Sequence, residues 1–427
     1  SDPALSDRKG NYPNTTNPIL GGGDLGYQAG STFKMFTMLA ALEQGMPLAT
    51  AFQSPHQYRS QYVGGTAEDA SACQINGTYH WCPKNASKHM AGLRNMWSGF
   101  GMSVNTFFVQ LEEVVGSDKA VAMAEKLGLQ WRGADKERAE DPEQSKNWGA
   151  FTIGVPETSP LEMANAYATL AADGTYCKPL PVVEIFDRDG DEIPGAKPSC
   201  HQAVTPDVAR AATDAARCPV GESPQGGSCG GTGTATSVGA NVNQPVAGKT
   251  GTTDNNQAAW FVGYTPKLAG AAFETDPDYR RNSVYSTADP NHVFGEALRA
   301  YYGNKQMKNF PAPPKDLAQG DMASVPSVYC KSVEEATRIL TRAGFKPREN
   351  STRVPSRCSA GSVAYTKPTG RAPKNGYVTM FISNGQPPPP DPTTKPTKPG
   401  NDPRPPDNPD DPCGPRGCWP PRPPGRD

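Results

Sequence analysis

The stretch that decides the fold is STFKMFTMLAALEQG, residues 31–45. A serine opens it, apolar side chains occupy most positions through Leu42, and Gly45 ends it, as expected for a helix with a glycine stop. A helix that is apolar on most of its faces is buried in a core and does not lie on the surface. We therefore expect this helix to pass through the middle of a globular domain.

Other elements are predicted around this helix from the period of the apolar residues. Helical periodicity returns in four segments, at 106–115, 119–127, 160–172 and 290–302. Strand-like patterns are found at 245–252 and 258–265, on either side of a polar turn, and a hairpin is predicted at 181–195 around Asp189-Gly190. Turns and loops are expected in three segments, at 1–30, 50–92 and 218–244. The fold class is therefore α/β of the α+β type, with an antiparallel sheet flanked by helices.

The chain of 427 residues is too long for one core. After a main domain at 1–310, a proline-rich linker at 311–323 leads to a second, smaller α/β cycle at 324–385, with a helix at 333–343 and strands near 363–365 and 378–382. The tail, 386–427, holds 17 of the 45 prolines. Such proline density excludes helix and sheet, so the tail is predicted to be polyproline II or disordered.

Charge and hydropathy exclude two classes of protein. Lys and Arg number 42 against 43 Asp and Glu, a balance that argues against nucleic-acid binding. No stretch approaches the roughly 18 apolar residues that a membrane span needs, and the first residues do not resemble a signal peptide. We expect the protein either to be soluble or to be anchored by a segment that lies outside this sequence.

Ten cysteines are present, and they fall into five pairs of sequence neighbours. The predicted disulfides are Cys73–Cys82, Cys177–Cys200, Cys218–Cys229, Cys330–Cys358 and Cys413–Cys418. Five such bridges indicate an oxidising, exported environment; the alternative is ten unrelated buried thiols. No Cys-x-x-Cys motif and no histidine at zinc-finger spacing occurs, so neither a metal nor a cofactor is expected.

Three short motifs could carry chemistry. Ser31 and Lys34 stand three residues apart at the start of the buried helix, which places hydroxyl and amine on one helix face. A serine becomes a nucleophile only when a base takes its proton, and a lysine serves as that base when burial lowers its pKa. The alternative is a capping serine beside an exposed lysine.

The second motif is Ser103-Val104-Asn105 and the third is Lys249-Thr250-Gly251, followed by Thr252. Serine and asparagine before a helix are also common N-caps. A lysine inside a strand is unusual in a buried element, and a glycine there fits close approach of a substrate backbone. The alternative for the lysine is an edge-strand charge that deters aggregation.

In this order, Ser-x-x-Lys, Ser-x-Asn and Lys-Thr-Gly are the motif set of the penicillin-recognising serine acyltransferases. Residues 25–305 resemble the transpeptidase domain of class A penicillin-binding proteins, through STFKMFTMLAALEQG, SVNTFFVQLEEVVG, SPLEMANAYATLAADG and AGKTGTTDNNQAAWFVGYTP. Residues 324–385 resemble a PASTA domain, although Cys330 and Cys358 depart from its usual pattern. Class A proteins also carry a glycosyltransferase domain and a membrane helix before the transpeptidase, and neither is found in this sequence.

The resemblance implies three catalytic residues. Ser31 would attack the penultimate D-alanine of a peptidoglycan stem peptide and expel the terminal D-alanine. Lys34 would be the base, and Ser103 would pass a proton to the leaving amine. β-Lactams would acylate the same serine, and an amine from a second strand would resolve the acyl-enzyme into a crosslink.

It further implies a substrate-binding set, Asn105, Lys249, Thr250, Gly251 and Thr252. Asn105 would hold the amide of the donor peptide and position Lys34. Lys249 would depress the pKa of Lys34 and, with the two threonine hydroxyls, bind the terminal carboxylate. The N–H groups of Ser31 and Thr252 would form the oxyanion hole.

Two other functions remain open at this point. One is a hydrolase on the same scaffold, a β-lactamase or a DD-carboxypeptidase, for which Glu157 and Glu162 are the candidates to hold a water. The other is a non-catalytic wall-binding or sensor protein. Residues 324–385 contain ten Lys and Arg against three Glu, a net charge of +7, which predicts attraction to an anionic wall polymer or lipid; the alternative is that this surface docks on the acidic remainder. The expected location is the cell-wall side of a bacterial plasma membrane.

Overall fold

The computed structural model describes residues 26–388, apart from residues 181, 183, 194–196, 277, 278 and 280. The predicted turns of residues 1–25, the proline-rich tail beyond residue 388 and the Cys413–Cys418 pair therefore lie outside the described residues. In the described part of the chain, no helix has the length and apolar content needed to cross a bilayer.

The main sheet contains three antiparallel strands in the order β11-β10-β9. They are β9 (Ala247–Thr252), β10 (Ala258–Tyr264) and β11 (Ala269–Thr275). The two strands predicted around the polar turn are thus confirmed, and the register places Lys249 of β9 opposite Val262 of β10. The third strand, β11, is not apparent in the sequence because every one of its residues is only half-buried and the alternation of apolar residues is weak.

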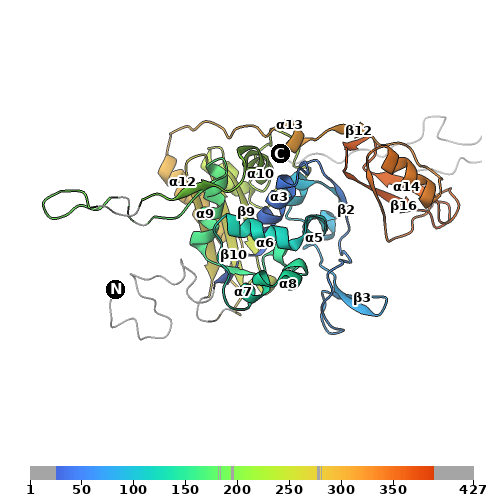
Figure 1. Cartoon of the computed structure of the whole chain (residues 1–427), viewed down its shortest axis with the longest axis horizontal. Coiled ribbons are helices and arrows are strands. Elements are labelled where there is room, and N and C mark those ends of the chain that lie inside the picture. Colours follow the sequence, from blue (N-terminus) through green and yellow to red (C-terminus); the bar gives the residue numbers. More distant parts are fainter. Residues whose placement is uncertain are drawn as a thin grey trace, which may run out of the picture. The chain divides into compact units, whose positions relative to one another are not determined.

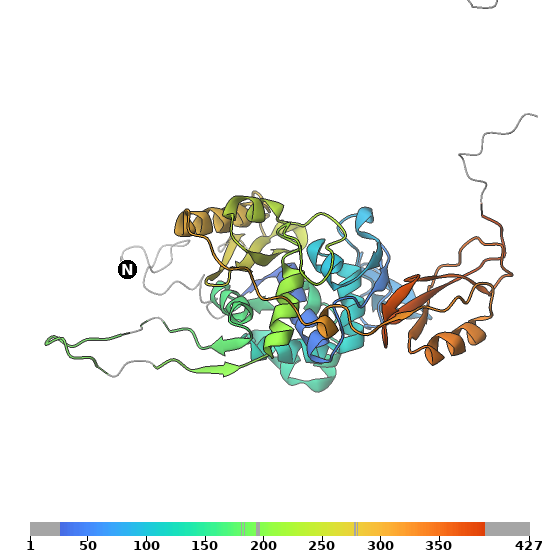
Figure 2. The same ribbon diagram turned by 90° about the horizontal axis from the view of Figure 1, so that it is seen from above.

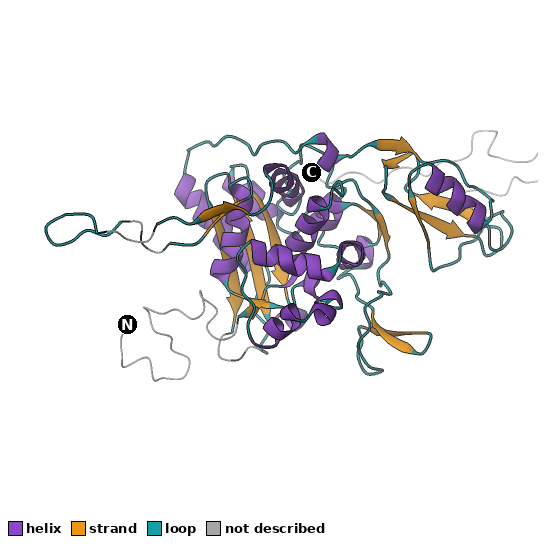
Figure 3. Cartoon of the chain, viewed as in Figure 1, coloured by secondary structure: helices purple, strands orange, loops and turns teal. Residues whose placement is uncertain are grey.

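Side chains of β10 alternate between two cores, which makes the domain three-layered. Trp260, Val262 and Tyr264 face the larger core, and Phe261 faces a second one. The first face is covered by α3 (Lys34–Glu43), α9 (Pro160–Ala171) and α10 (Pro206–Ala216), and the second by α11 (Thr236–Val242) and α12 (Asp289–Tyr302). Figure 3 shows helices on both sides of these strands.

Helix α3 lies in the centre of the larger core, as predicted from its apolar sequence. All residues from Lys34 to Leu42 are buried. Around it pack α10, α5 (Asn105–Val115) and α6 (Ser117–Lys126), which Figure 1 shows surrounding it. The chain enters α3 through a 3-10 turn, η1 (Gly30–Phe33), so that Ser31 lies in this turn and Lys34 begins the α-helix.

Two segments predicted as loops contain regular structure. Residues 50–92 hold short strands, which are β2 (Phe52–Ser54), β3 (Ala72–Ile75) and β4 (Thr78–Trp81), and β5 (Gly92–Arg94) follows. Residues 218–244 hold helix α11. These elements are only three to seven residues long, and a period of apolar residues is hard to detect over so short a stretch.

The other described elements lie around this framework, except β12 and β15, which pair with each other and join the core of the smaller α/β cycle. The helices are α4 (Met96–Gly101), α7 (Gly133–Glu140), α8 (Pro142–Lys146), α13 (Lys315–Ala318) and the 3-10 turns η2 (Lys88–Met90), η3 (Phe151–Ile153) and η4 (Asp254–Asn256). The strands are β1 (Tyr27–Gln28), β6 (Glu157–Thr158), β7 (Thr175–Cys177), β8 (Cys200–Gln202), β12 (Met322–Ser324) and β15 (Arg371–Pro373). Strands β7 and β8 pair outside the predicted hairpin and lead away from the helices, as Figure 2 shows. Within the described part of the predicted range 181–195, the pairing is limited to one isolated bridge between Phe186 and Glu192.

The smaller α/β cycle has a core of its own. Strand β16 (Tyr377–Ile382) pairs in parallel with β13 (Lys346–Glu349) and antiparallel with β14 (Val363–Lys367). Helix α14 (Val333–Arg342) packs on them through Ala336 and Leu340. The helix begins at Ser332, whose side chain accepts a hydrogen bond from the N–H of Glu335, a regular N-cap.

Four of the five predicted cysteine pairs are disulfides in the structure. They join Cys73 to Cys82, Cys177 to Cys200, Cys218 to Cys229 and Cys330 to Cys358. Among the described residues no cysteine is free. The alternative of unrelated buried thiols therefore does not hold for these eight residues, and each closed loop restrains the unfolded chain.

Candidate active site

Ser31 lies at the N-terminal end of the buried helix, next to the amine of Lys34. The Nζ atom of Lys34 is 2.9 Å from Ser31 Oγ. Ser31 does not cap the helix, because the residue before the turn is Ala29 and no side chain caps it. Lys34 is fully buried. The alternative of a capping serine beside an exposed lysine is therefore excluded.

The amine of Lys34 is held from a second direction by the Ser-x-Asn motif. It donates to Asn105 Oδ1 at 2.6 Å and to the carbonyl oxygen of Ser103 at 2.8 Å, and it lies 3.1 Å from Ser103 Oγ. Asn105 is itself fixed, because its Nδ2 donates to the carbonyl of Lys84 at 2.9 Å. The motif thus orients the amine toward Ser31.

The N-cap interpretation of Ser103 and Asn105 is wrong. The N-cap of α5 is Val104, and no side-chain hydrogen bond caps it. Ser103 has φ +58°, a left-handed conformation that is uncommon for residues other than glycine. This turn points both side chains at Lys34, and backbone strain of this kind is found at functional sites.

Lys249 closes the arrangement from the sheet. Its Nζ is 2.8 Å from Ser103 Oγ and donates to the carbonyl of Thr250 at 3.0 Å. The interpretation of Lys249 as an exposed edge-strand charge is wrong, since this residue is fully buried. A chain of short contacts therefore runs from Ser31 Oγ through Lys34 Nζ and Ser103 Oγ to Lys249 Nζ.

Burial shifts the pKa of both lysines downward. Loss of solvation, followed by repulsion from Lys249, holds the pKa of Lys34 well below the usual lysine range. Loss of solvation also lowers the pKa of Lys249 to about 7. Aromatic rings partly replace the lost water, because the amine of Lys34 lies 5.8 Å from the ring centroid of Phe108 and that of Lys249 lies 5.6 Å from that of Phe100. Lys34 is thus able to be neutral while Lys249 is still charged.

The edge of β9 presents backbone N–H groups toward Ser31. Thr253 donates to the carbonyl of Ala258, and hydrogen-bonded pairs alternate along antiparallel strands. The N–H groups of Thr250 and Thr252 therefore point away from β10. The turn before Ser31 packs tightly on this edge, since a Cβ on Gly30 would come within 2.5 Å of the Thr252 carbonyl oxygen.

Gly251 also has a packing role that the sequence does not indicate. A Cβ there would lie 2.1 Å from the carbonyl oxygen of Ala29 and 3.1 Å from the Cβ of Trp260. The absent side chain thus allows β9 to pack on the turn that carries Ser31. It maintains the position of Ser31 relative to the strand.

Three features of the site were not predicted. Phe100 and Phe108 face the two lysines, and the hydroxyl of Thr250 donates to Thr234 Oγ1 at 2.8 Å. Thr234 lies within the glycine-rich stretch 218–244, where the sequence shows no period. Thr234 directly follows the glycine-rich run at 226–233, a pattern that does not distinguish it from the neighbouring threonines at 232 and 236.

The carboxylate of Glu162 has a structural role. It accepts from the N–H of Ser159 at 2.9 Å in a capping box that starts α9, and it pairs with Arg132 at 2.8 Å. Glu157 belongs to β6, which pairs with β1. Within the described ranges, no three His, Cys, Asp or Glu side chains are grouped so that they could hold a metal ion.

Two family models match the chain. The penicillin binding protein transpeptidase domain matches residues 24–288, more than half of the chain, and the PASTA domain matches residues 323–384. The chain is 30% identical to penicillin-binding protein 1A of Aquifex aeolicus over 322 residues, which covers 72% of this chain and 39% of that protein. It is 29% identical to penicillin-binding protein 1A of Clostridium novyi over 245 residues, covering 56% of this chain and 25% of that protein. The chain therefore spans well under half the length of these relatives.

Solved structures show the same fold. The PonA1 protein of Mycobacterium tuberculosis in complex with penicillin V is similar with a TM-score of 0.51 and 25% identity, covering 71% of this chain and 76% of that one. Penicillin-binding protein 1A of Haemophilus influenzae is similar with a TM-score of 0.53 and 19% identity, covering 84% of this chain and 48% of that one. At 19% identity the second likeness concerns the fold alone.

Proposed function

The chain belongs to the penicillin-binding protein transpeptidase family and carries a PASTA domain, and on that premise we propose that it is a serine DD-transpeptidase that cross-links the stem peptides of peptidoglycan. The observation that carries the proposal is the contact chain from Ser31 to Lys249. It places a nucleophile, a buried amine and a second hydroxyl in succession, at 2.9, 3.1 and 2.8 Å.

In the acylation step, neutral Lys34 accepts the proton of Ser31 Oγ. The oxygen then attacks the carbonyl carbon of the penultimate D-alanine. The N–H groups of Ser31 and Thr252 bind the oxyanion, each donor contributing about 2.7–4 kcal/mol of transition-state stabilisation. The tetrahedral intermediate collapses as the C–N bond breaks, and Ser103 passes a proton from Lys34 to the departing D-alanine amine. The ester on Ser31 and free D-alanine are the products.

Substrate recognition is assigned to the sheet edge and to Asn105. The Lys249 ammonium attracts the terminal carboxylate, which accepts hydrogen bonds from the hydroxyls of Thr250 and Thr252. The amide of Asn105 binds the peptide chain of the donor. Gly251 acts indirectly, by letting β9 approach the turn of Ser31. An amine of a second stem peptide then attacks the ester and forms the crosslink.

A hydrolase on the same scaffold is the competing function. Rapid hydrolysis of the acyl-enzyme needs a carboxylate that activates water, and Glu162 is engaged by Arg132 and by the cap of α9. This favours transfer over hydrolysis. The four disulfides and the family favour an extracytoplasmic location on the wall side of the membrane.

The test of the proposed function is product analysis with a peptide ending in D-alanyl-D-alanine and an amine acceptor. We expect release of D-alanine together with a crosslinked peptide, and neither product from Ser31→Ala. Ser71→Ala, which alters a hydroxyl bonded to Asp69, is the matched control and should be fully active. Release of D-alanine without a crosslink would instead identify a carboxypeptidase. Unchanged biological activity of Ser31→Ala in cells would identify a non-catalytic protein.

The PASTA domain is proposed to bind an anionic wall polymer or lipid. Eight of its ten basic side chains are exposed, namely Arg338, Arg342, Lys346, Arg353, Arg357, Lys367, Arg371 and Lys374. Arg348 is different, because its guanidinium lies 4.3 Å from the ring centroid of Tyr377 and 5.3 Å from that of Phe52. Arg348 thus contacts the larger domain and Lys374 pairs with Asp321 of the linker at 2.6 Å, while eight of the ten basic side chains remain exposed to solvent.

Wall binding by the full chain should weaken as salt rises. It should weaken further in Arg353→Glu/Arg357→Glu, and Ser31→Ala should bind like the parent protein. Binding to isolated cell wall that is indifferent to salt would contradict the electrostatic proposal.

A further inference from the structure

The stretch between α10 and α11, residues 217–235, lies against the active site and is closed by the Cys218–Cys229 disulfide. We infer that Thr234, held at the cleft by this disulfide-closed loop, is a positioning residue for the substrate carboxylate, acting through the hydroxyl of Thr250. This inference rests on the proposed transpeptidase function. It adds a residue outside the three motifs and gives the disulfide a part in substrate selection.

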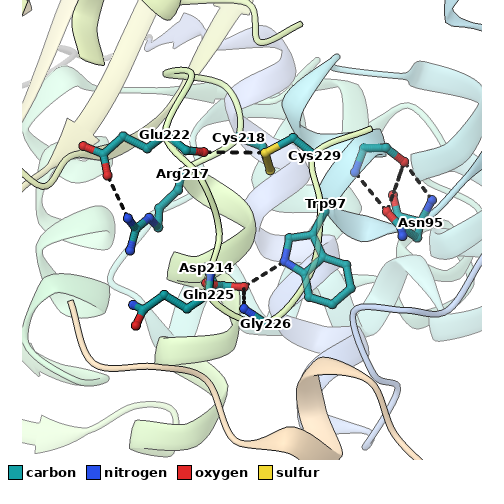
Figure 4. The surroundings of a disulfide bond; sticks show 10 residues. Asn95, Trp97, Asp214, Arg217, Cys218, Glu222, Gln225, Gly226 and Cys229 are labelled. Carbon is teal, nitrogen blue, oxygen red and sulfur yellow. Dashed lines mark hydrogen bonds and ion pairs between the residues drawn. A yellow bond between two sulfur atoms is a disulfide. The ribbon is translucent and has the colours of Figure 1, made fainter. Parts of the chain in front are cut away.

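The loop is fixed to the domain by one buried carboxylate, Asp214, which is 2% exposed. Its Oδ2 accepts from Trp97 Nε1 at 2.9 Å and from the N–H of Gly226 at 3.0 Å, and its Oδ1 accepts from the N–H of Gln225 at 2.5 Å. Figure 4 shows these contacts beside the disulfide. Asp214 belongs to α10 and Trp97 to α4, so the loop is tied to both helices.

The loop also lies flat on α4, the helix that leads into Ser103. A Cβ on Gly227 would come within 2.6 Å of the Trp97 ring, and one on Gly231 within 2.5 Å of Met102 Sδ. A Cβ on Gly101, at the end of α4, would lie 2.8 Å from Cys218 Cβ. The glycines of the loop therefore permit a close fit against the wall of the cleft that carries Ser103.

A second tie fixes the loop to the sheet. Glu222 pairs with Arg217 at 3.0 Å, and its other oxygen accepts from the N–H of Val246, directly before β9. Figure 4 shows the pair of Glu222 and Arg217 on the side of the disulfide opposite Asn95. The loop thus connects the Ser103 wall with the start of the strand that carries Lys249.

Thr234 lies at the end of this loop and is exposed, so a substrate can reach its surroundings. Its Oγ1 is 2.8 Å from Thr250 Oγ1, and Thr250 Oγ1 is 3.4 Å from Lys249 Nζ. A threonine hydroxyl has one hydrogen to donate. In the structure Thr250 donates to Thr234 Oγ1; when the substrate carboxylate accepts the hydrogen of Thr250 beside the Lys249 ammonium, the Thr234 hydroxyl turns and donates to Thr250 Oγ1 in return. Thr234 thereby orients the Thr250 hydroxyl, which binds the carboxylate.

The experiment compares a penicillin that has its free carboxylate with the methyl ester of the same penicillin, by the rate of acylation of the full chain. For the free acid, Thr234→Ala should slow acylation about 10- to 100-fold, the loss expected for a hydrogen bond to a charged group. The methyl ester presents no charge to Thr250. The ester should therefore acylate the Thr234→Ala variant as fast as it acylates the parent protein. Thr234→Ser should restore the free-acid rate, and Thr234→Val should not.

The disulfide is tested in the same assay. Cys218→Ala/Cys229→Ala should reproduce the selective loss, and combining it with Thr234→Ala should add little, because both changes remove one interaction. Cys177→Ala/Cys200→Ala, which opens the bridge between β7 and β8, is the matched control and should leave both rates unchanged. Equal loss with acid and ester, or failure of Thr234→Ser to restore the rate, would overturn the inference. Absence of acylation in the parent protein would instead contradict the proposed function.

Discussion

The amine of Lys249 lies 2.8 Å from the hydroxyl oxygen of Ser103, although 146 residues separate them along the chain. The two residues come from different walls, one from the edge of the sheet and one from the turn before α5. Lys34 contacts the same hydroxyl at 3.1 Å. One serine oxygen therefore links two buried amines, and each amine influences the proton of the other.

The rate of acylation should depend on pH and should decline near pH 7 on the alkaline side of its maximum. The rate rises as Lys34 loses its proton, since only the neutral amine accepts the proton of Ser31. It falls again as Lys249, whose pKa burial lowers to about 7, loses the charge that attracts the carboxylate. In Lys249→Arg the second charge persists, so the decline near pH 7 should disappear. The pH profile of acylation by a carboxylate-bearing β-lactam measures this; a decline retained in Lys249→Arg would contradict it.

Lys249→Met should make the protein more stable while abolishing efficient acylation. The pKa of Lys249 is lower in the folded state than the usual value of about 10.4, so the unfolded chain binds more protons and stability rises with pH between the two values. Removing the amine should therefore raise the free energy of unfolding by about 4 kcal/mol at pH 7, at 1.36 kcal/mol for each pKa unit, and the gain should shrink toward pH 10. Denaturant titrations at several pH values check this. An advantage of Lys249→Met in the free energy of unfolding that grew with pH would contradict the prediction.

The variants Ser103→Gly and Ser103→Ala should lose acylation activity to the same extent but differ in stability. Both remove the hydroxyl between the lysines, so acylation should fall about 10²- to 10⁴-fold in each. Glycine adopts the φ of +58° without strain, and alanine does not. The glycine variant should thus be about 1 kcal/mol more stable than the alanine variant. Thermal unfolding of the pair gives the answer, and equal stability would mean that the turn is not strained.

Glu112→Met should stabilise the protein at neutral pH. Glu112 is fully buried on α5, and neither of its carboxylate oxygens makes a hydrogen bond of regular geometry among the described residues, although the N–H of Thr152 and the hydroxyl of Tyr62 lie close enough to offset part of the effect of burial on its pKa. Burial raises the pKa of Glu112 well above the usual range, so folding disfavours the charged carboxylate that the unfolded chain carries at neutral pH. Replacing it should raise the free energy of unfolding by about 1–3 kcal/mol, with a smaller gain near pH 4, where the unfolded chain is protonated as well.

Its neighbour provides the control. Glu113 accepts from Tyr58 Oη at 2.7 Å and from the N–H of Gln61 at 2.7 Å, so Glu113→Met should destabilise the protein. If Glu112→Met lost as much stability as Glu113→Met, the buried carboxyl of Glu112 would have to make stabilising hydrogen bonds, which would contradict the prediction.

The sequence predicts most of the framework of the site. Helix α3 is predictable because it is apolar on most of its faces, and β9 and β10 because a polar turn separates two short apolar runs. Spacing alone puts Ser31 beside Lys34 on one helix face. The contacts of Ser103 and Lys249 depend on tertiary structure, and the resemblance of three ordered motifs is what indicated them in advance.

The remaining parts depend on contacts that no local pattern encodes. Residues 218–244 are rich in glycine, which gives no period, and their path is fixed by Asp214 and Trp97. The reason for Gly251 is likewise tertiary, since the clash it avoids is with Ala29. Thr234 could be recognised only after the loop had been placed.

The most direct test of the account is the mass of the intact protein after incubation with penicillin. We expect one adduct with the full mass of the drug, because opening of the β-lactam ring releases nothing. It should map to Ser31, persist for hours and be absent from Ser31→Ala. An adduct that remains in Ser31→Ala, or no adduct on the parent protein, would contradict the claim that this hydroxyl is the nucleophile.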